Sequence, residues 1–318
     1  MKKPKLLVSL IVEENTYQQD QAAAAREAGQ RLGLDIQILY AENDSITQSQ
    51  QLLDAIQSSS PDARPDAIVC HPVGTTLMQV ARAAAARGIG WALLNREDDY
   101  IEDLRTDNKA PALSIAVNQE EIGRIQAHQM SALLPEGGVA LYIVGPSSNP
   151  SFARRTAGME SVKPKNIQII TLRGKFTEQS GFDTVKSWLR LSTARTSMVA
   201  LVAGQNDNMA MGARRAFAEN FNGPELERWA NLPYIGCDAG RTTGQEWVRE
   251  GLLTASVALP PTAGVAVEML ARALETKTQP PNRKQLHSVS YPEIEKLVSP
   301  IKLLSEMSAG KNERLSHR

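Results

Sequence analysis

The 318-residue chain has little cysteine, few aromatic side chains and no excess charge of either sign. Its two cysteines, Cys70 and Cys237, each end an apolar run, which predicts buried, reduced thiols and not a disulfide or redox pair. The 35 basic residues balance the 35 acidic ones, so no net field favours nucleic acid or an anionic membrane. The four histidines lack the spacing of metal ligands. We therefore expect no metal, no cofactor and no nucleic-acid partner.

The sequence also lacks the motifs of common enzyme classes. The pair Gly88 and Gly90 has no third glycine and no preceding strand of the kind that a dinucleotide site needs. Neither a phosphate-binding G-x-x-x-x-G-K-[ST] loop nor a G-x-S-x-G nucleophile turn occurs. We therefore expect no catalytic residues and no enzymatic activity.

The N-terminus is ambiguous at first sight. Met1–Lys5 and the apolar run Leu6–Val12 have the charged start and short apolar core of a signal peptide, but no small-residue cleavage site follows. The run is better explained as the first strand of the fold. We expect no signal peptide, no transmembrane helix and no direct membrane insertion.

Strand-like and helix-like segments alternate along the chain, which predicts parallel sheets covered by helices on both faces. The expected strands are 6–12, 35–40, 67–70, 91–94, 113–117, 139–144, 167–172, 198–203, a strand starting at 234, 253–259 and 286–290. The expected helices are 17–32, 47–57, 75–87, 119–134, 152–162, 178–191, 206–217, 242–249 and 262–276. The charged segment 97–111 is expected to be a loop.

This length is large for one core and suits two α/β domains. The two series predict an N-terminal subdomain of residues 1–115 plus 260–287 and a C-terminal subdomain of 116–259 plus 288–310. The chain would cross between them near Ala116, Leu259 and Ser288, which makes a three-strand hinge. Residues 311–318 are expected to form a disordered tail.

Polar side chains follow three of the expected strands. Asn206 and Asp207 come after the run 198–203, Asp238 ends the strand that starts at Tyr234, and Arg96 follows the strand 91–94. In open α/β sheets, ligands bind beyond the carboxyl ends of the strands. The sequence therefore predicts a polar ligand site built from strand ends.

Several blocks of the sequence, in this order, resemble one known family. They are ENTYQ (14–18), AENDSITQSQQLLDAI (41–56), CHPVGTTLMQVARAAAARGIGWALLNR (70–96), ARRTAG (153–158), GQNDNMAMGARRAF (204–217), IGCDAG (235–240) and GLLTASVALP (251–260). Together they are similar to the type I periplasmic binding proteins of the ribose-binding, sugar-binding group. The two domains of that family also form the effector domain of lactose-repressor-like regulators.

The resemblance implies two doubly wound, Rossmann-like parallel-sheet domains and non-catalytic binding of a sugar or sugar-like small polyol in the interdomain cleft, with hinge closure. It also implies partners: the permease of a sugar ABC transporter, or a membrane sensor. The periplasm is the implied location, while the absent signal peptide leaves the alternative of a cytoplasmic effector-sensing module without its own DNA-binding domain. By position, the implied ligand contacts are Asn15, Tyr17, His71, Asn95, Arg96, Arg155, Phe176, Asn206 and Asp238.

Departures from the family pattern leave the ligand's identity open, and they fall at Gln18, His71, Gly74, Asn95 and Leu259. Asn95 stands where aspartate is usual, which removes a negative, acceptor-only group. Gln18 replaces a second aromatic residue, so one stacking face is thinner.

Plainer roles remain open for several of these residues. Asn206 has the alternative role of capping its helix. A slip of one residue would exchange Arg155 for Arg154, and the spacing to Gly158 favours Arg155. Three others have ordinary alternatives as packed hydrophobes or a satisfied histidine, namely Tyr17, Phe176 and His71. We interpret Trp91, Trp188, Met209 and Met211 as packing residues.

Overall fold

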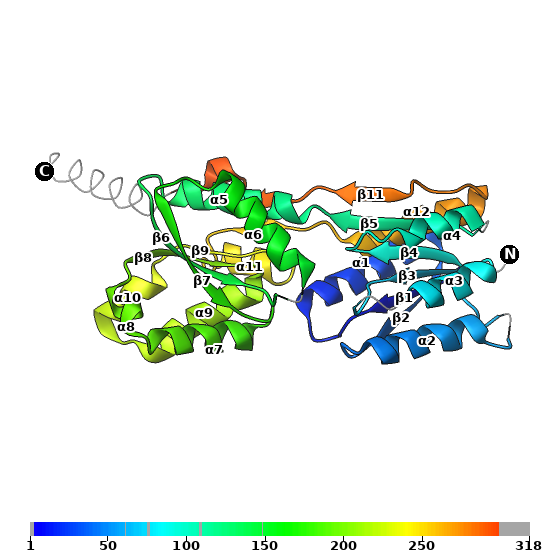
Figure 1. Ribbon diagram of the computed structural model, residues 1–318, viewed down its shortest axis with the longest axis horizontal. Helices are drawn as coiled ribbons and strands as arrows, with labels where there is room; N and C mark the ends of the chain where they lie inside the picture. Colours follow the sequence, from blue (N-terminus) through cyan, green and yellow to red (C-terminus); the bar gives the residue numbers. More distant parts are fainter. Residues whose placement is uncertain (1–2, 61, 75–76, 108–109, 148, 299–318) are drawn as a thin grey trace, which may run out of the picture. The chain divides into compact units, whose positions relative to one another are not determined.

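A computed structural model describes residues 3–60, 62–74, 77–107, 110–147 and 149–298 (Figure 1). Within it the chain divides into two compact units. Of the described residues, unit 1 holds those up to Val117 together with Pro260–His287, and unit 2 holds those of Asn118–Leu259 and those from Ser288 to Val298. The expected tail 311–318 and the expected helix start at Thr75 lie outside the described residues.

Unit 1 is built on a six-stranded parallel sheet in the order β11-β5-β4-β3-β1-β2. Its strands are β1 (Lys5–Leu10), β2 (Asp35–Tyr40), β3 (Ala67–Cys70), β4 (Gly90–Leu94), β5 (Ala112–Val117) and β11 (Arg283–Leu286). Its helices are α1 (Thr16–Leu32), α2 (Ser45–Gln57), α3 (Met78–Ala86), α4 (Tyr100–Asp107) and α12 (Thr262–Thr276).

Helices cover both faces of this sheet, because its central strands are apolar on both sides (Figure 1). One face, with Leu6 and Val8 of β1, packs against α1 and α12. The other face, with Leu7 of β1 and Trp91 of β4, packs against α2, α3 and α4. Trp91 is fully buried, so its interpretation as a core residue is confirmed.

Unit 2 is built on a four-stranded parallel sheet in the order β7-β6-β8-β9 and a two-stranded antiparallel ribbon of β10 and β12. Its strands are β6 (Gly138–Val144), β7 (Ile167–Arg173), β8 (Val199–Gly204), β9 (Tyr234–Ile235), β10 (Ser256–Ala258) and β12 (Val289–Tyr291). Its helices are α5 (Gln119–Leu133), α6 (Pro150–Val162), α7 (Glu178–Leu189), α8 (Ser192–Thr196), α9 (Asp207–Asn220), α10 (Gly223–Ala230), α11 (Gly244–Arg249) and the 3-10 turn η1 (Ile294–Lys296).

Two helix pairs of unit 2 cross at glycines. A Cβ on Gly123 of α5 would lie 2.0 Å from the carbonyl oxygen of Arg155, and one on Gly158 of α6 would lie 2.0 Å from that of Glu120. The pair α7 and α9 repeats this arrangement with Gly181 and Gly212. The two backbones of each pair therefore touch, which fixes the position of α6 against α5 and of α9 against α7.

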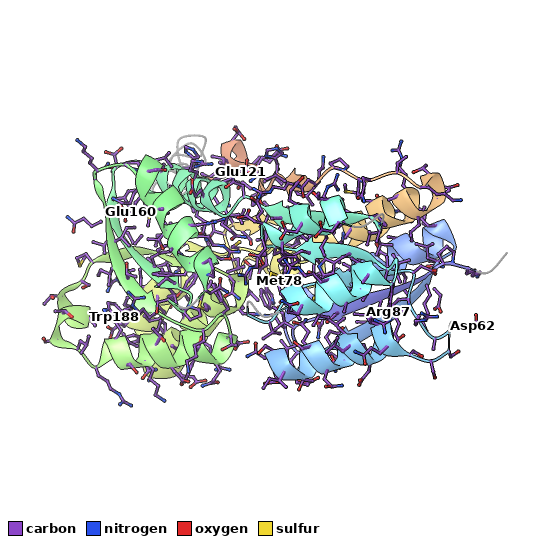
Figure 2. The ribbon with its side chains drawn as sticks, turned by 45° about the vertical axis from the view of Figure 1, so that its right-hand side comes forward. Asp62, Met78, Arg87, Glu121, Glu160 and Trp188 are labelled. Carbon is purple, nitrogen blue, oxygen red and sulfur yellow. The ribbon has the colours of Figure 1, made fainter. Side chains whose placement is uncertain are left out.

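The side chains of α7 and α9 fill one side of unit 2. Trp188 of α7 lies in unit 2 (Figure 2) and is 4% exposed. Its ring packs edge-on against that of Trp229 of α10. Met209 of α9 is fully buried and Met211 packs against the same cluster. Their interpretation as packing residues is therefore confirmed.

The expectation of a loop over 97–111 is wrong. Residues Tyr100–Asp107 form α4, because Tyr100, Ile101 and Leu104 lie on one helical face and are buried against the unit 1 core. The expected strand 253–259 is also too long, since only Ser256–Ala258 pairs as β10. Helices α8 and α10 were not expected, and buried Trp229 holds α10 on the core.

Both cysteines are buried and free, as expected. Burial raises the pKa of both thiols, that of Cys70 to about 12, so they stay protonated. In the described part of the chain, no helix combines the length and the hydropathy that crossing a bilayer requires.

Candidate functional site

Five predicted ligand residues of unit 1 lie around the carboxyl ends of β1, β3 and β4. Asn15 and Tyr17 begin α1 after β1, His71 follows β3, and Asn95 and Arg96 follow β4. The structure brings three of them into contact. Asn95 Nδ2 lies 2.8 Å from Tyr17 Oη and 3.5 Å from His71 Nε2. The rings of Tyr17 and His71 meet edge to face, with centroids 6.1 Å apart.

Gln18 connects this group to the backbone. Its side chain is 4% exposed, and its Oε1 accepts a hydrogen bond from the Ile11 N–H at 3.0 Å. Its Nε2 lies 2.8 Å from His71 Nδ1. Desolvation lowers the pKa of His71 to about 4, so the ring is neutral at pH 7. The sequence analysis treated Gln18 only as a missing aromatic residue and did not foresee this role.

Gln48 of α2 is fully buried and fixes the loop that carries His71 through hydrogen bonds. Its Nε2 donates to Ser9 Oγ at 3.0 Å and to the His71 carbonyl at 2.9 Å. Its Oε1 accepts from the Val73 N–H at 2.7 Å. A buried amide that satisfies three partners fixes the position of the loop.

Arg96 has a counter-charge within its own unit. Its Nε lies 2.8 Å from Asp98 Oδ2, and its Nη1 donates to the Gly74 carbonyl at 2.6 Å. The side chain is 31% exposed, so the guanidinium is anchored but remains in reach of solvent. The sequence analysis did not identify Asp98 as its partner.

Asn15 caps the start of α1, with its Oδ1 accepting from the Gln18 N–H at 3.2 Å. In unit 2, Asn206 does the same for α9: its Oδ1 accepts from the Met209 N–H at 3.0 Å. The capping role left open for Asn206 is therefore present. Its Nδ2 also donates to the Phe176 carbonyl at 2.9 Å, so both ends of this amide have protein partners.

Arg155 of α6 is buried, at 6% exposure, whereas its neighbour Arg154 is exposed. Its Nε donates to Gln119 Oε1 at 2.8 Å, and its Nη1 donates to the carbonyl of Gln205. The fully buried Gln205 side chain in turn accepts from the Gly145 N–H at 3.0 Å and donates to Thr156 Oγ1 at 3.0 Å. Gln205 was not among the predicted residues, although a glutamine directly after a buried strand is itself a signal.

Phe176 lies over Gly145, the residue that follows β6. A Cβ on Gly145 would lie 2.0 Å from the Phe176 ring, so only glycine leaves room for it. The Arg155 guanidinium carbon lies 6.0 Å from the centre of the same ring. The structure thus brings Arg155, Phe176 and Asn206 together at the carboxyl edge of the unit 2 sheet.

Asp238 follows β9, and Asp207 holds the turn beside it. Asp207 Oδ2 accepts from the Ala239 N–H at 2.8 Å, and its Oδ1 accepts from Ser256 Oγ at 2.5 Å. Its carboxylate fills the space that a Cβ on Gly236 or Gly244 would occupy. Burial, and then the charge of Asp238, raise the pKa of Asp207 well above its usual range.

Three predicted ligand residues have backbones in the left-handed region. The φ angles are 56° at Asn95, 62° at Phe176 and 114° at Asp238, and Ala239 follows at 43°. Asparagine tolerates this region, but a bulky phenylalanine does so only under strain. Such conformations concentrate at functional sites, where the surrounding structure holds them.

The chemistry of these side chains is that of hydrogen bonding and not of metal binding. Within the described residues, no group of three or more His, Cys, Asp or Glu side chains is arranged to hold a metal ion. Amides, a guanidinium and a carboxylate beside aromatic rings suit a ligand that is rich in hydroxyl groups.

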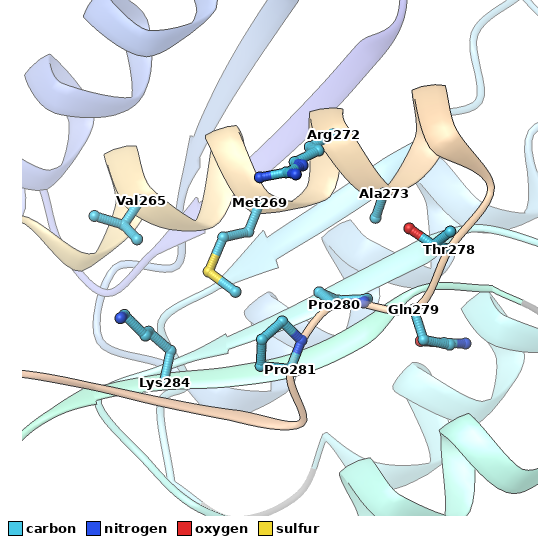
Figure 3. A pocket seen from close by; sticks show the side chains of 9 residues that line it. All are labelled: Val265, Met269, Arg272, Ala273, Thr278, Gln279, Pro280, Pro281 and Lys284. Carbon is cyan, nitrogen blue, oxygen red and sulfur yellow. The ribbon is translucent and has the colours of Figure 1, made fainter.

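Two cavities of unit 1 lie at the other edge of its sheet. One, of about 470 Å³, lies where Val265 and Met269 of α12 face Pro280 and Pro281, which precede β11 (Figure 3). The other, of about 1030 Å³, is lined in part by Pro4 and Asp66, which precede β1 and β3. Both cavities lie at the amino ends of the strands, so they are separate from the candidate site at the carboxyl ends.

A family model described as the periplasmic binding protein domain matches residues 6–278 of the chain. The chain belongs to the periplasmic binding protein family. A protein of Rhizobium meliloti, provisionally named a rhizopine-binding protein, is 30% identical over 190 residues. That match covers 58% of this chain and 57% of the relative, so the chain matches less than two thirds of its length.

Solved structures of the same fold cover most of the chain. An ABC transporter periplasmic solute-binding protein from Actinobacillus succinogenes with bound D-allose has a TM-score of 0.76 at 19% identity, over 91% of this chain and 97% of that one. A solute-binding protein from Bacillus halodurans with bound myo-inositol has a TM-score of 0.73 at 19% identity, over 92% and 96%. The predicted fold class, two sets of parallel strands in a type I periplasmic binding protein fold, is confirmed.

Proposed function

We propose that the chain binds a sugar or sugar-like polyol without transforming it, and that both units contact the same ligand. One observation carries the proposal: in each unit, hydrogen-bonding side chains gather where parallel strands end. This is the edge at which open α/β sheets bind ligands. The ligand residues we propose are Asn15, Tyr17, His71, Asn95, Arg96, Arg155, Phe176, Asn206 and Asp238.

The side chains match the chemistry of a polyol. Each hydroxyl group both donates and accepts, and burying one without partners is costly. Arg96 and Arg155 supply donors, Asp238 supplies an acceptor, and the rings of Tyr17 and Phe176 supply apolar faces for C–H groups. Binding would draw the two units together, since contacts made by both exist only when they approach the same ligand.

We further propose that the protein delivers its ligand to the permease of an ABC transporter in the periplasm, or presents it to a membrane sensor. Membership of the periplasmic binding protein family supports this role. The names of the D-allose and myo-inositol proteins, which describe ABC transporter solute-binding proteins, support it as well.

A thermal-shift screen over pentoses, hexoses and cyclitols tests the binding. A ligand at a hundred times its Kd stabilises the folded state by about 2.7 kcal/mol through mass action, which raises the Tm by several degrees. Mass spectrometry of the bound compound after long incubation should find it unchanged. A flat screen, or turnover above a protein-free blank, would contradict the proposal.

Closure is tested separately by small-angle scattering. We expect smaller dimensions with saturating ligand than without it. Equal dimensions in both samples would argue against domain closure while leaving the binding itself intact.

A further inference from the structure

The side chains around His71 form a chain of hydrogen bonds whose direction is fixed from one end. The backbone N–H of Ile11 can only donate, and Gln18 Oε1 accepts its hydrogen bond at 3.0 Å. The other end of the same amide, Nε2, must then be the group that lies 2.8 Å from His71 Nδ1. Because an amide nitrogen only donates, His71 Nδ1 has to be the unprotonated, accepting nitrogen of the ring.

A neutral imidazole carries one proton, so the proton of His71 is on Nε2. Burial, which lowers the pKa of this histidine to about 4, keeps the ring in that neutral form at pH 7. His71 Nε2–H is therefore a donor, and it faces the side-chain amide of Asn95 at 3.5 Å.

The amide of Asn95 has two orientations of the same shape, and its neighbours decide between them. With Nδ2 toward His71, two donors oppose each other, and Asn95 Oδ1 is buried without a partner among the described residues. Turning the amide over lets Oδ1 accept from His71 Nε2–H and from the Tyr17 hydroxyl, which lies 2.8 Å away. The NH2 group then occupies the unpartnered position.

We propose that Gln18, acting through His71, turns the amide of Asn95 so that its NH2 group faces the ligand. The part of the site around Asn95, called this corner below, then selects a ligand oxygen that accepts hydrogen bonds without donating one, such as an ether, ring or carbonyl oxygen. The selectivity rests on the proposed function, whereas the direction of the relay does not. Gln18 is a positioning residue here, since it acts on the ligand only through its neighbours.

The neighbouring Arg96 strengthens the selection. A guanidinium has no acceptor, and its Nε is already held by Asp98 at 2.8 Å. A ligand hydroxyl at this corner receives hydrogen bonds from Asn95 and Arg96 but finds neither able to accept its own proton. An ether or ring oxygen makes the same contacts and leaves no donor unsatisfied.

The direction of the relay is tested by 15N NMR of the ligand-free protein at pH 7. The His71 ring signals are assigned by comparison with His71→Gln, and we expect an unprotonated Nδ1 and a protonated Nε2. In Gln18→Met, which cannot donate to Nδ1, the ring should lose this strict preference. A wild-type ring protonated at Nδ1 would overturn the proposal, whether or not any sugar binds.

The selectivity is tested by calorimetry with myo-inositol and each of its mono-O-methyl ethers. We expect at least one ether to bind the wild type as tightly as the parent compound. In Asn95→Asp, whose carboxylate only accepts, the ratio of the Kd of that ether to the Kd of myo-inositol should rise about tenfold or more. Asp tolerates the φ of 56° as Asn does, so the backbone is retained.

Asn43→Asp is the matched control, because Asn43 is exposed and has a φ of 57° in the same unit. It should leave the ratio unchanged. A change of less than threefold in Asn95→Asp for every ether would overturn the selectivity. If the wild type binds none of these probes, the selectivity fails, while the thermal-shift screen decides the proposed function and the NMR result decides the relay.

Discussion

The candidate ligand residues are held in place by different kinds of side chain in the two units. In unit 1, Tyr17, His71 and Asn95 are connected through Gln18, and all four side chains are neutral at pH 7. In unit 2, the buried Arg155 is held by Gln119 and Gln205, and the buried Asp207 holds the turn beside Asp238. A neutral amide is buried at little cost once its hydrogen bonds are replaced within the protein, whereas a buried charge needs further compensation for its lost hydration.

This difference separates two tasks. The guanidinium of Arg155 in unit 2 is buried and has few rotamers left to lose, so it suits strong, orienting contacts, whereas Arg96 in unit 1 is 31% exposed. Unit 1 sets the direction of donors and acceptors through a relay, which suits the recognition of one oxygen type over another. The predictions below test whether that separation holds.

The largest effect is expected for Arg155→Met, which removes the buried guanidinium but keeps most of its volume. Hydrogen bonds to charged groups contribute about 1.5–3 kcal/mol, so affinity for the ligand should fall about 10- to 150-fold. Calorimetry measures the affinity, and urea unfolding checks that the variant folds. The exposed neighbour is the control, and Arg154→Met should stay within threefold of the wild type. Equal losses in both variants would contradict the special role of Arg155.

The second effect concerns the stability of the protein in acid. The pKa of His71 falls from 6.5 in the unfolded chain to about 4 in the folded one, so the unfolded state takes up the proton first. The stabilisation is complete above about pH 6.5 and is lost as the pH falls toward 4. Relative to His71→Gln, the free energy of unfolding of the wild type should drop by about 3 kcal/mol between pH 7 and pH 4. Parallel pH profiles of the two proteins would refute this.

A smaller effect is expected for Arg96→Ala in unit 1. The guanidinium is partly exposed and already shares its charge with Asp98, so we expect a loss of about ten- to a hundredfold in affinity. Arg96→Lys should also bind poorly, because an ammonium cannot reproduce the planar fork. Arg82→Ala is the control, since Arg82 forms a surface ion pair with Asp103 at 3.2 Å. An Arg96→Ala affinity within threefold of the wild type would remove Arg96 from the site.

The smallest effect is expected for Asp207→Asn, and its sign is opposite to that of His71. Burial raises the pKa of Asp207, so the folded state holds the proton more tightly than the unfolded one. The stabilisation is present at low pH and is lost as the pH rises through the folded pKa. Asparagine can accept from the Ala239 N–H and donate to Ser256 Oγ. The free energy of unfolding of Asp207→Asn should therefore rise relative to that of the wild type as the pH rises. A difference in the free energy of unfolding that stays constant across the pH range would contradict the raised pKa of Asp207.

The fold was largely predictable because burial on both faces of a parallel sheet leaves uninterrupted apolar runs in the sequence. The runs at 67–70 and 139–144 were expected and observed as β3 and most of β6. Helix α4 was missed because its three buried residues stand among charged ones, and only the core beneath them makes that face apolar. Local pattern could not show that core.

The predicted site residues gather within each unit, whereas their supporting partners were not foreseen. Gln18, Gln205 and Asp98 act through hydrogen bonds that depend on tertiary packing, and of the three only Gln205, directly after a buried strand, has a position that the sequence marks. Asp207 was recognised as part of a helix start, but not as the residue that holds the turn of Asp238. The end of a strand can be predicted from the sequence more readily than the hydrogen-bond partners that hold the side chain after it.

The glycine crossings of unit 2 have a consequence for how the site can evolve. Because the backbones of α5 and α6 touch at Gly123 and Gly158, a larger residue at either position requires the other helix to withdraw. The carbonyl in contact with Gly123 belongs to Arg155 itself, so withdrawal would displace the guanidinium. Helices α5 and α6 are therefore coupled through this backbone contact, and a shift of one requires a shift of the other. Transplanting α6 into a relative without α5 would move Arg155 even though every residue of the graft is retained.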